Sequence, residues 1–213
     1  MSGTRASDRA AVPGSDVPVI GRALPWILVA GGGIGLLAAA ALLVEKMLVL
    51  DDPGHTPACS IDPVLSCGSV MNTPQAEAFG VPNPLIGVAG FAVVLTVGAG
   101  LLAGARFARW FWWGLQAGTL FGAAFVHWLI FQSLYRIGAL CPYCMVVWAV
   151  TVPLFWYVTL YNLREGHLRL PRALNPAAGV LSRNHTVVLT LWFLGLGVVI
   201  WQAFQVYWST LLQ

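Results

Sequence analysis

The sequence has few charged residues: they make up 9% of its 213 residues, whereas 58% are hydrophobic. A soluble domain would carry about a quarter of its residues as charged ones, so the composition excludes that class and predicts a polytopic membrane protein. Charge is absent from five stretches, which cover residues 23–44, 78–105, 110–135, 137–163 and 184–213. About 20 apolar residues cross the hydrocarbon layer as a helix, so the sequence predicts five transmembrane helices.

The basic residues are concentrated in three regions. Nine of the eleven Lys and Arg residues lie in the N-terminal tail, in the connection 104–110 or in the connection 164–183. With five spans these regions share one side of the membrane, which the positive-inside rule makes cytoplasmic. The loop 51–83 has no Lys or Arg, so we expect it and the C-terminus on the exoplasmic side. The two exceptions, Lys46 and Arg136, can extend to a nearby interface.

These features predict an all-α integral membrane protein with five transmembrane helices. The first span is longer than a signal-peptide core and lacks a small-residue cleavage pattern, so we expect a retained helix. Its stretch "AGGGIGLLAAAALL" is rich in small residues, which allow close helix contacts in lipid. The predicted parts are a disordered cytoplasmic tail (1–22), the first four helices (23–163) with an exoplasmic loop (51–83), a basic cytoplasmic connection (164–185) and the fifth helix (186–213).

All four cysteines lie on the expected outer side. Cys59 and Cys67 enclose seven residues in "CSIDPVLSC", and Cys141 and Cys144 lie in "LCPYCMVVW". An even count in an oxidising compartment favours disulfides, and two structural disulfides are one possibility. That explanation suits the loop pair better, because a helical turn already fixes Cys141 and Cys144 and leaves little chain entropy to remove. A zinc site usually needs closely spaced pairs on both sides, so we expect no metal.

The second cysteine pair opens a predicted helix. Pro142 suits the first helical position, and the unpaired N–H groups and dipole of a helix N-terminus lower the pKa of a thiol such as Cys141. Cys144 lies one turn further, about 4.5 Å deeper. We expect Cys141 to face water and Cys144 to face the bilayer, which suits electron transfer between aqueous dithiols and a lipid-soluble acceptor. A soluble glutaredoxin is excluded, because its "CPYC" needs a βαβ context.

The order of these features resembles the vitamin K epoxide reductase family, in particular its bacterial members. The resemblance rests on "CSIDPVLSCGSVM", "VPNPLIGVAGF" and "LCPYC" and covers roughly residues 25–163. It implies a four-helix bundle that encloses a quinone of the menaquinone or ubiquinone type. Some bacterial members continue into a fused thioredoxin-like domain. This sequence ends at Gln213, so we expect a separate exoplasmic partner with a thioredoxin fold, of the DsbA type.

The resemblance also implies a role for each cysteine. Cys59 would meet the partner, Cys67 would pass electrons to Cys141, and Cys144 would face the quinone. Asn83 matches an Asn that hydrogen-bonds a quinone oxygen in the family.

Two of these positions have a second interpretation or depart from the family. From the residues alone, Asn83 before Pro84 is also typical of a helix cap. Trp148 stands where the vertebrate enzymes have a Tyr that contacts the quinone. An indole cannot accept a hydrogen bond, so we expect this contact to be altered.

His127 is the only histidine inside the first four predicted spans. It shares a helix face with Gln116 and Thr119, and interhelical hydrogen bonds explain such a stripe; quinone binding or proton handling by His127 is the alternative. His55, close to Cys59, is expected to be a solvated loop residue.

The leading hypothesis is a thiol:quinone oxidoreductase of a bacterial cell membrane. It would reoxidise its partner, support disulfide formation in exported proteins, and contact lipid and quinone but no nucleic acid. One alternative is a quinone or quinone-epoxide reductase that runs in the vertebrate direction. Another is the disulfide-bond protein B type, whose Cys-x-x-Cys precedes its widely spaced pair, the reverse of the order here. A third is a non-enzymatic membrane scaffold with two inert disulfides.

Overall fold

The structure is a computed structural model that describes residues 18–52, 54–62, 64–168, 175–205, 207 and 209. Most of the predicted tail 1–22 and part of the connection 164–185 therefore lie outside the described residues. Within the described ranges every regular element is helical, and extended pairing is confined to an isolated bridge. The predicted all-α fold is confirmed.

Five helices are long and apolar enough to cross a membrane, as predicted. They are α1 (Pro18–Asp51), α3 (Asn83–Leu102), α4 (Arg109–Gln132), α5 (Pro142–Arg164) and α7 (His185–Ala203). The shorter elements are α2 (Cys67–Met71), the 3-10 helix η1 (Pro74–Glu77), the π-helical turn η2 (Ser133–Ile137) and α6 (Asn175–Arg183).

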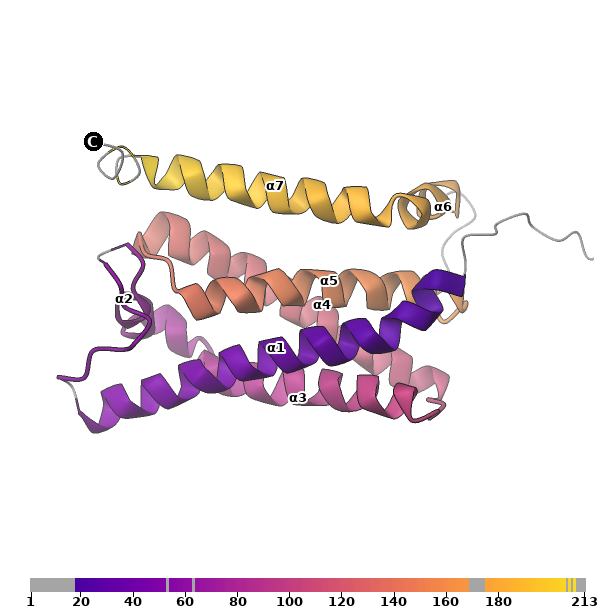
Figure 1. The fold of residues 1–213 in the computed structure, drawn as a ribbon, viewed down its shortest axis with the longest axis horizontal. Helices are drawn as coiled ribbons and strands as arrows, with labels where there is room; N and C mark the ends of the chain where they lie inside the picture. The colour runs from indigo at the N-terminus through magenta and orange to yellow at the C-terminus, as the bar shows by residue number, and fades with distance from the viewer. Residues whose placement is uncertain are drawn as a thin grey trace, which may run out of the picture.

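Four of the long helices form a bundle, in which α1 packs against α3 and α5, and α4 packs against α5 (Figure 1). Each contributes to a shared apolar core, represented by Leu28, Phe91, Trp112 and Val158. The fifth long helix, α7, runs along the outside of this bundle. Its C-terminal end lies at the same end of the molecule as α2.

Glycine lets α1 and α3 approach each other closely. A Cβ atom on Gly32 would lie 2.7 Å from the backbone nitrogen of Leu95. From the other helix, a Cβ atom on Gly98 would lie 2.8 Å from the backbone nitrogen of Val29. Backbone cannot move aside as a flexible side chain can, so the contact requires residues without Cβ. The small residues of the first span thus form the helix contact that the sequence predicts.

Helix α1 is longer than the uncharged stretch 23–44 suggests, because its charged residues find partners in the loop. The Lys46 side chain is buried, and its Nζ lies 3.0 Å from the Met71 carbonyl oxygen and 3.0 Å from Glu77 Oε1. The expectation that Lys46 extends to the membrane interface is therefore wrong. The loop satisfies the ammonium group in place of water.

The loop between α1 and α3 folds back onto the bundle. Leu65 forms a short parallel bridge with Leu140, in the segment just before α5. The Leu140 N–H donates to the Val64 carbonyl at 2.7 Å, and the Ser66 N–H donates to the Leu140 carbonyl at 2.9 Å. Gly138, with φ of 71°, reverses the chain between η2 and this segment. The pairing places Cys67 directly beside the start of α5.

Three basic residues at helix ends lie at the end of the bundle away from α2. Arg22 is near the start of α1, Arg109 starts α4 and Arg164 ends α5, and Figure 1 shows these ends together. Arg109 also hydrogen-bonds the His167 carbonyl at 3.0 Å. The three basic regions thus share one side in their described parts. That this side is cytoplasmic stays a prediction.

Two neighbouring glycines test the α1–α3 contact. Gly32→Ala should lower the free energy of unfolding by about 1–3 kcal/mol, because the new methyl group meets the backbone of α3. Gly33→Ala is the matched control, since nothing lies within 4 Å of its Cβ position. Denaturant unfolding in detergent micelles measures both; equal stability of the two variants would contradict the close contact.

Candidate active site

The four cysteines of the two motifs come together at one end of the bundle. Cys59 and Cys67 form a disulfide, while Cys141 and Cys144 are free thiols. The Cys67 and Cys141 sulfur atoms lie 3.1 Å apart. They pack in one buried cluster with Leu42 of α1. A thiol in contact with a disulfide is the arrangement that thiol–disulfide exchange requires.

Cys141 caps the N-terminus of α5, with Pro142 at the first helical position, as predicted. Its sulfur accepts a hydrogen bond from the Cys144 backbone N–H at 3.3 Å. The pKa of Cys141 is lowered, first by the hydrogen bond from the Cys144 thiol and then by the backbone N–H groups of Cys144 and Tyr143, against the opposing effect of burial. However, Cys141 is fully buried, so the expectation that it faces water is wrong. Cys67 and its loop cover it.

Cys59 is also buried, with 6% of its surface exposed. The arm that carries it is held by Glu45 of α1, whose carboxylate accepts from the Ala58 N–H at 3.3 Å and contacts His55 Nε2 at 2.9 Å. His55 is thus bound to Glu45. The expectation of a simply solvated loop histidine is therefore wrong. The next residue, Lys46, contacts Met71 and Glu77, which follow Cys67 in the loop. Two adjacent charged residues of α1 therefore hold the loop segments on both sides of the disulfide, which we call the Cys59 arm and the Cys67 arm.

Sequence reasoning missed this role of Glu45 and Lys46. The sequence does contain a sign of it. An acidic and a basic residue directly follow the uncharged stretch 23–44, and a helix that ends free in solvent does not require such a pair.

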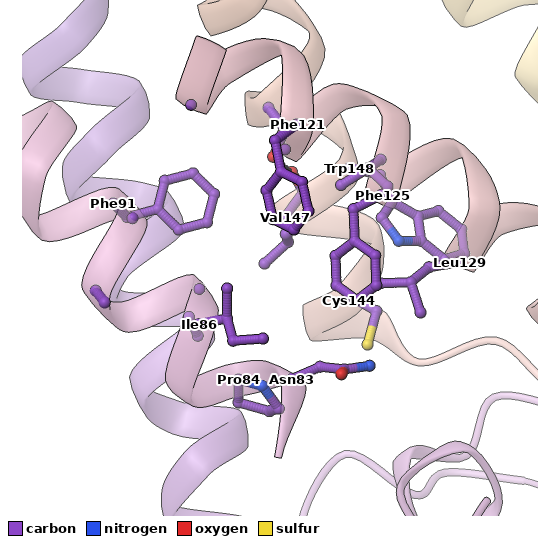
Figure 2. Close-up of a pocket in the computed structure, with 18 of the residues that line it drawn as sticks. Asn83, Pro84, Ile86, Phe91, Phe121, Phe125, Leu129, Cys144, Val147 and Trp148 are labelled. Carbon is purple, nitrogen blue, oxygen red and sulfur yellow. Dashed lines mark hydrogen bonds between the residues drawn. The ribbon is translucent and has the colours of Figure 1, made fainter. Parts of the chain in front are cut away.

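A cavity of about 670 Å³ lies between α3, α4 and α5, beneath the loop. Its walls are mostly apolar, and α3 and α4 contact each other little along it. Cys144, Asn83 and Trp148 contribute polar groups to the lining. Figure 2 shows the Cys144 sulfur and the Asn83 amide pointing into the same part of this cavity, with Phe91 and Phe125 further along. The cysteine pair at the start of α5 therefore connects the loop to an apolar chamber.

Asn83 is not a helix cap, which corrects one of its two interpretations. Its Oδ1 accepts a hydrogen bond from the Ala78 N–H at 3.2 Å, and its Nδ2 donates to the Gln75 carbonyl at 2.7 Å. These contacts run to the η1 region and not to the first turn of α3. They fix the orientation of the amide and leave the second hydrogen of Nδ2 for a ligand.

Trp148 is almost fully buried, with 2% of its surface exposed, and lines the cavity. Among the described residues none accepts a hydrogen bond from its indole N–H, and Figure 2 shows the nitrogen edge of the ring toward the cavity. A buried N–H without an acceptor costs about 1–3 kcal/mol, so such groups usually have a partner. The arrangement fits a bound molecule that offers a hydrogen-bond acceptor.

His127 does not line the cavity. Its Nδ1 lies 2.7 Å from the Ala123 carbonyl, and its Nε2 accepts from Trp192 Nε1 of α7 at 3.0 Å. The first interpretation of this residue, an interhelical hydrogen bond, is confirmed. Gln116 likewise bonds Thr159 of α5 at 2.9 Å. Thr119, the third residue of that stripe, lines the cavity.

The sequence matches the vitamin K epoxide reductase family over residues 26–159. The chain belongs to this family. A comparison with curated proteins found no match. The matched range runs from α1 through most of α5 and includes all four cysteines, Asn83 and Trp148; α7 lies beyond it. As a vitamin K epoxide reductase homologue with five membrane-length helices, the protein is a multi-pass membrane oxidoreductase.

Replacing Lys46 tests how the loop is held. Lys46→Met should speed hydrogen exchange in residues 68–77 about tenfold, because the Met71 carbonyl and Glu77 lose their common partner. Arg136→Met is the matched control, since it removes an exposed cation at the same end of the bundle. Exchange followed by mass spectrometry measures both variants. Unchanged protection in the Lys46 variant would show that the ion pair does not hold the loop.

Proposed function

We propose that the protein is a membrane thiol–disulfide:quinone oxidoreductase. It takes two electrons from the dithiol of a separate thioredoxin-fold protein and passes them through its two cysteine pairs to a membrane quinone. The observation that carries this proposal is the continuous line of four sulfur atoms from the folded loop to the apolar cavity. A scaffold with two inert disulfides does not need the two pairs to touch.

In the first step the partner reduces the loop disulfide. One thiolate of the partner attacks Cys59, which forms a mixed disulfide and releases Cys67 as a thiolate. The second thiolate of the partner then displaces Cys59, so the partner leaves oxidised and the loop pair is reduced. Cys59 is assigned to the partner because the Cys67 sulfur already packs against Cys141 at 3.1 Å. Since Cys59 is buried, its arm must lift away from Glu45 during this step.

In the second step the two pairs exchange. The Cys67 thiolate attacks Cys141 of a Cys141–Cys144 disulfide and releases Cys144; the Cys59 thiolate then attacks Cys67 and releases Cys141. The lowered pKa of Cys141 makes it a good leaving group. The observed state, with the loop pair bonded and the helix pair free, corresponds to the completed exchange.

The third step takes place at the cavity. A quinone is a substrate that accepts two electrons and two protons, and the two thiols supply both as the Cys141–Cys144 disulfide re-forms. The cavity volume of about 670 Å³ is within the usual range for ligand sites, and its apolar walls suit a quinone of the menaquinone or ubiquinone type with an isoprenoid tail. We assign Asn83 and Trp148 as hydrogen-bond donors to the two carbonyl oxygens.

The proposed setting is a bacterial cell membrane, with the loop on the exoplasmic side. Support comes from the basic residues at the opposite end of the bundle and from the disulfide in the loop, since disulfides persist in oxidising compartments. The net result of turnover in this direction is new disulfides in exported proteins. Reduction of a quinone epoxide, the alternative activity, would draw two electrons from a partner dithiol through the same cysteines, with the epoxide in place of the quinone as the acceptor.

Cys144→Ser should reduce quinone turnover to the uncatalysed background, because the helix pair can no longer form its disulfide. Reduced thioredoxin serves as the test dithiol and a short-tailed ubiquinone as the acceptor, followed by absorbance. Met145→Leu removes a neighbouring sulfur that does not line the cavity and should retain activity. The scaffold alternative requires the two variants to behave alike.

Trp148→Phe should raise the KM for quinone about three- to tenfold, the effect of losing one neutral hydrogen bond. The single ring is smaller than the indole and leaves space at this buried position, so thermal stability should also fall. Trp128→Phe is the control, since Trp128 lies on α4 outside the cavity lining. A KM that stays at the wild-type value in the Trp148 variant would remove this residue from the quinone site.

A further inference from the structure

The fifth helix and Tyr207, four residues past its end, lie outside the matched family range, yet Tyr207 reaches the loop that carries Cys67. We propose that α7 supports a segment that positions the cysteine relay, because Tyr207 in this segment holds the turn at Asp62 through a hydrogen bond. Tyr207 is then a positioning residue that acts through Asp62 on the contact between Cys67 and Cys141. The proposal deepens the proposed function and rests on it for its biological meaning.

The Asp62 side chain organises the turn that precedes Cys67. Its Oδ1 accepts hydrogen bonds from the N–H groups of Val64 and Leu65, both at 2.8 Å. The Ile61 N–H donates to the Leu65 carbonyl at 2.8 Å and closes the same turn. One carboxylate oxygen is thus used within the loop, and it sets the direction in which residues 64–66 leave the turn.

Those residues set the distance between the two cysteine pairs. Val64 and Ser66 supply the carbonyl and the N–H that pair with Leu140, at 2.7 and 2.9 Å. Cys67 follows Ser66, and Cys141 follows Leu140, so this pairing brings their sulfur atoms to 3.1 Å. Any movement of the Asp62 turn is therefore passed within five residues to the reacting sulfur of the loop.

The second oxygen of Asp62 is bound by a residue that follows the fifth helix. Tyr207 donates its hydroxyl to Asp62 Oδ2 at 2.7 Å. The N–H of Leu65 first, and then this hydroxyl, lower the pKa of Asp62 and keep its carboxylate ionised at neutral pH as a strong acceptor. Nearby, Phe204 is buried in the apolar cluster that contains Leu140 and against which Val64 and Leu65 pack.

Helix α7 is itself anchored to the bundle, so it can act as a support. At its start, His185 contacts the Tyr157 hydroxyl at 3.1 Å and accepts from Trp156 Nε1 at 3.2 Å. In its middle, Trp192 donates to His127 at 3.0 Å. None of the residues of α7 is fully buried, but Leu196, Val199 and Ile200 pack against the apolar cluster of the bundle, so apolar contacts and these hydrogen bonds together hold it in place. Tyr207, four residues past the end of α7, then fixes the position of Asp62.

The experiment measures how readily Cys67 and Cys141 form a disulfide, without partner or quinone. In a Cys59→Ser, Cys144→Ser full-length chain in nanodiscs, those two thiols equilibrate with glutathione: two protein thiols and one oxidised glutathione give one protein disulfide and two reduced glutathione. Tyr207→Phe should lower this equilibrium constant about three- to tenfold, because a freed turn holds the two sulfur atoms together less of the time.

Two comparisons separate positioning from general stability. Tyr135→Phe removes a hydroxyl at the same end of the bundle, from an exposed tyrosine, and should leave the constant unchanged. In an Asp62→Ala background Tyr207→Phe should have no further effect, because the hydroxyl acts through that carboxylate.

An unchanged constant in the Tyr207 variant, or an equal fall in both Asp62 backgrounds, would overturn the proposal. Failure of the proposed function would instead leave this constant as predicted while thioredoxin-dependent quinone reduction stays absent.

Discussion

Contact between the two cysteine pairs depends on one short piece of backbone pairing, between residues 64–66 of the loop and Leu140. Thiol–disulfide exchange needs direct contact between sulfur atoms, and this pairing brings the Cys67 and Cys141 sulfurs to 3.1 Å. Because each cysteine directly follows a paired residue, the backbone and not side-chain flexibility sets that distance. The Cys144 sulfur then lies one helical turn away and opens onto the apolar cavity. The four sulfurs become a path from one end of the bundle into its interior.

Helix α1 supports this pairing from two directions. In the bundle, Gly32 lets it approach α3 until backbone meets backbone, which fixes the frame on which the loop rests. At its outer end, Glu45 holds the arm before the loop disulfide and Lys46 holds the arm after it. The two arms are held differently. Glu45 contacts a partly exposed histidine and an exposed N–H, whereas Lys46 is buried. The Cys59 arm is therefore the one better suited to lift when a partner protein arrives.

The sequence predicted those features that depend on local composition. Uncharged length predicts the five helices, and the Cys-Pro dipeptide predicts the cap at Cys141. It could not predict contacts between distant residues. The partner of Lys46 lies 25 residues along the chain, and the partner of Tyr207 lies 145 residues away, so neither pair leaves a local pattern. Helical spacing placed His127 on a helix face but could not identify the neighbour that it meets, here α7.

The order in which disulfides appear during a single turnover tests the relay most directly. Fully reduced protein is mixed with excess short-tailed ubiquinone, quenched by alkylation at short times and mapped by mass spectrometry. The account predicts that the Cys141–Cys144 disulfide forms first and that the Cys59–Cys67 disulfide follows, because only Cys144 reaches the cavity. Appearance of the Cys59–Cys67 disulfide first, or at an unchanged rate in a chain without Cys144, would contradict it.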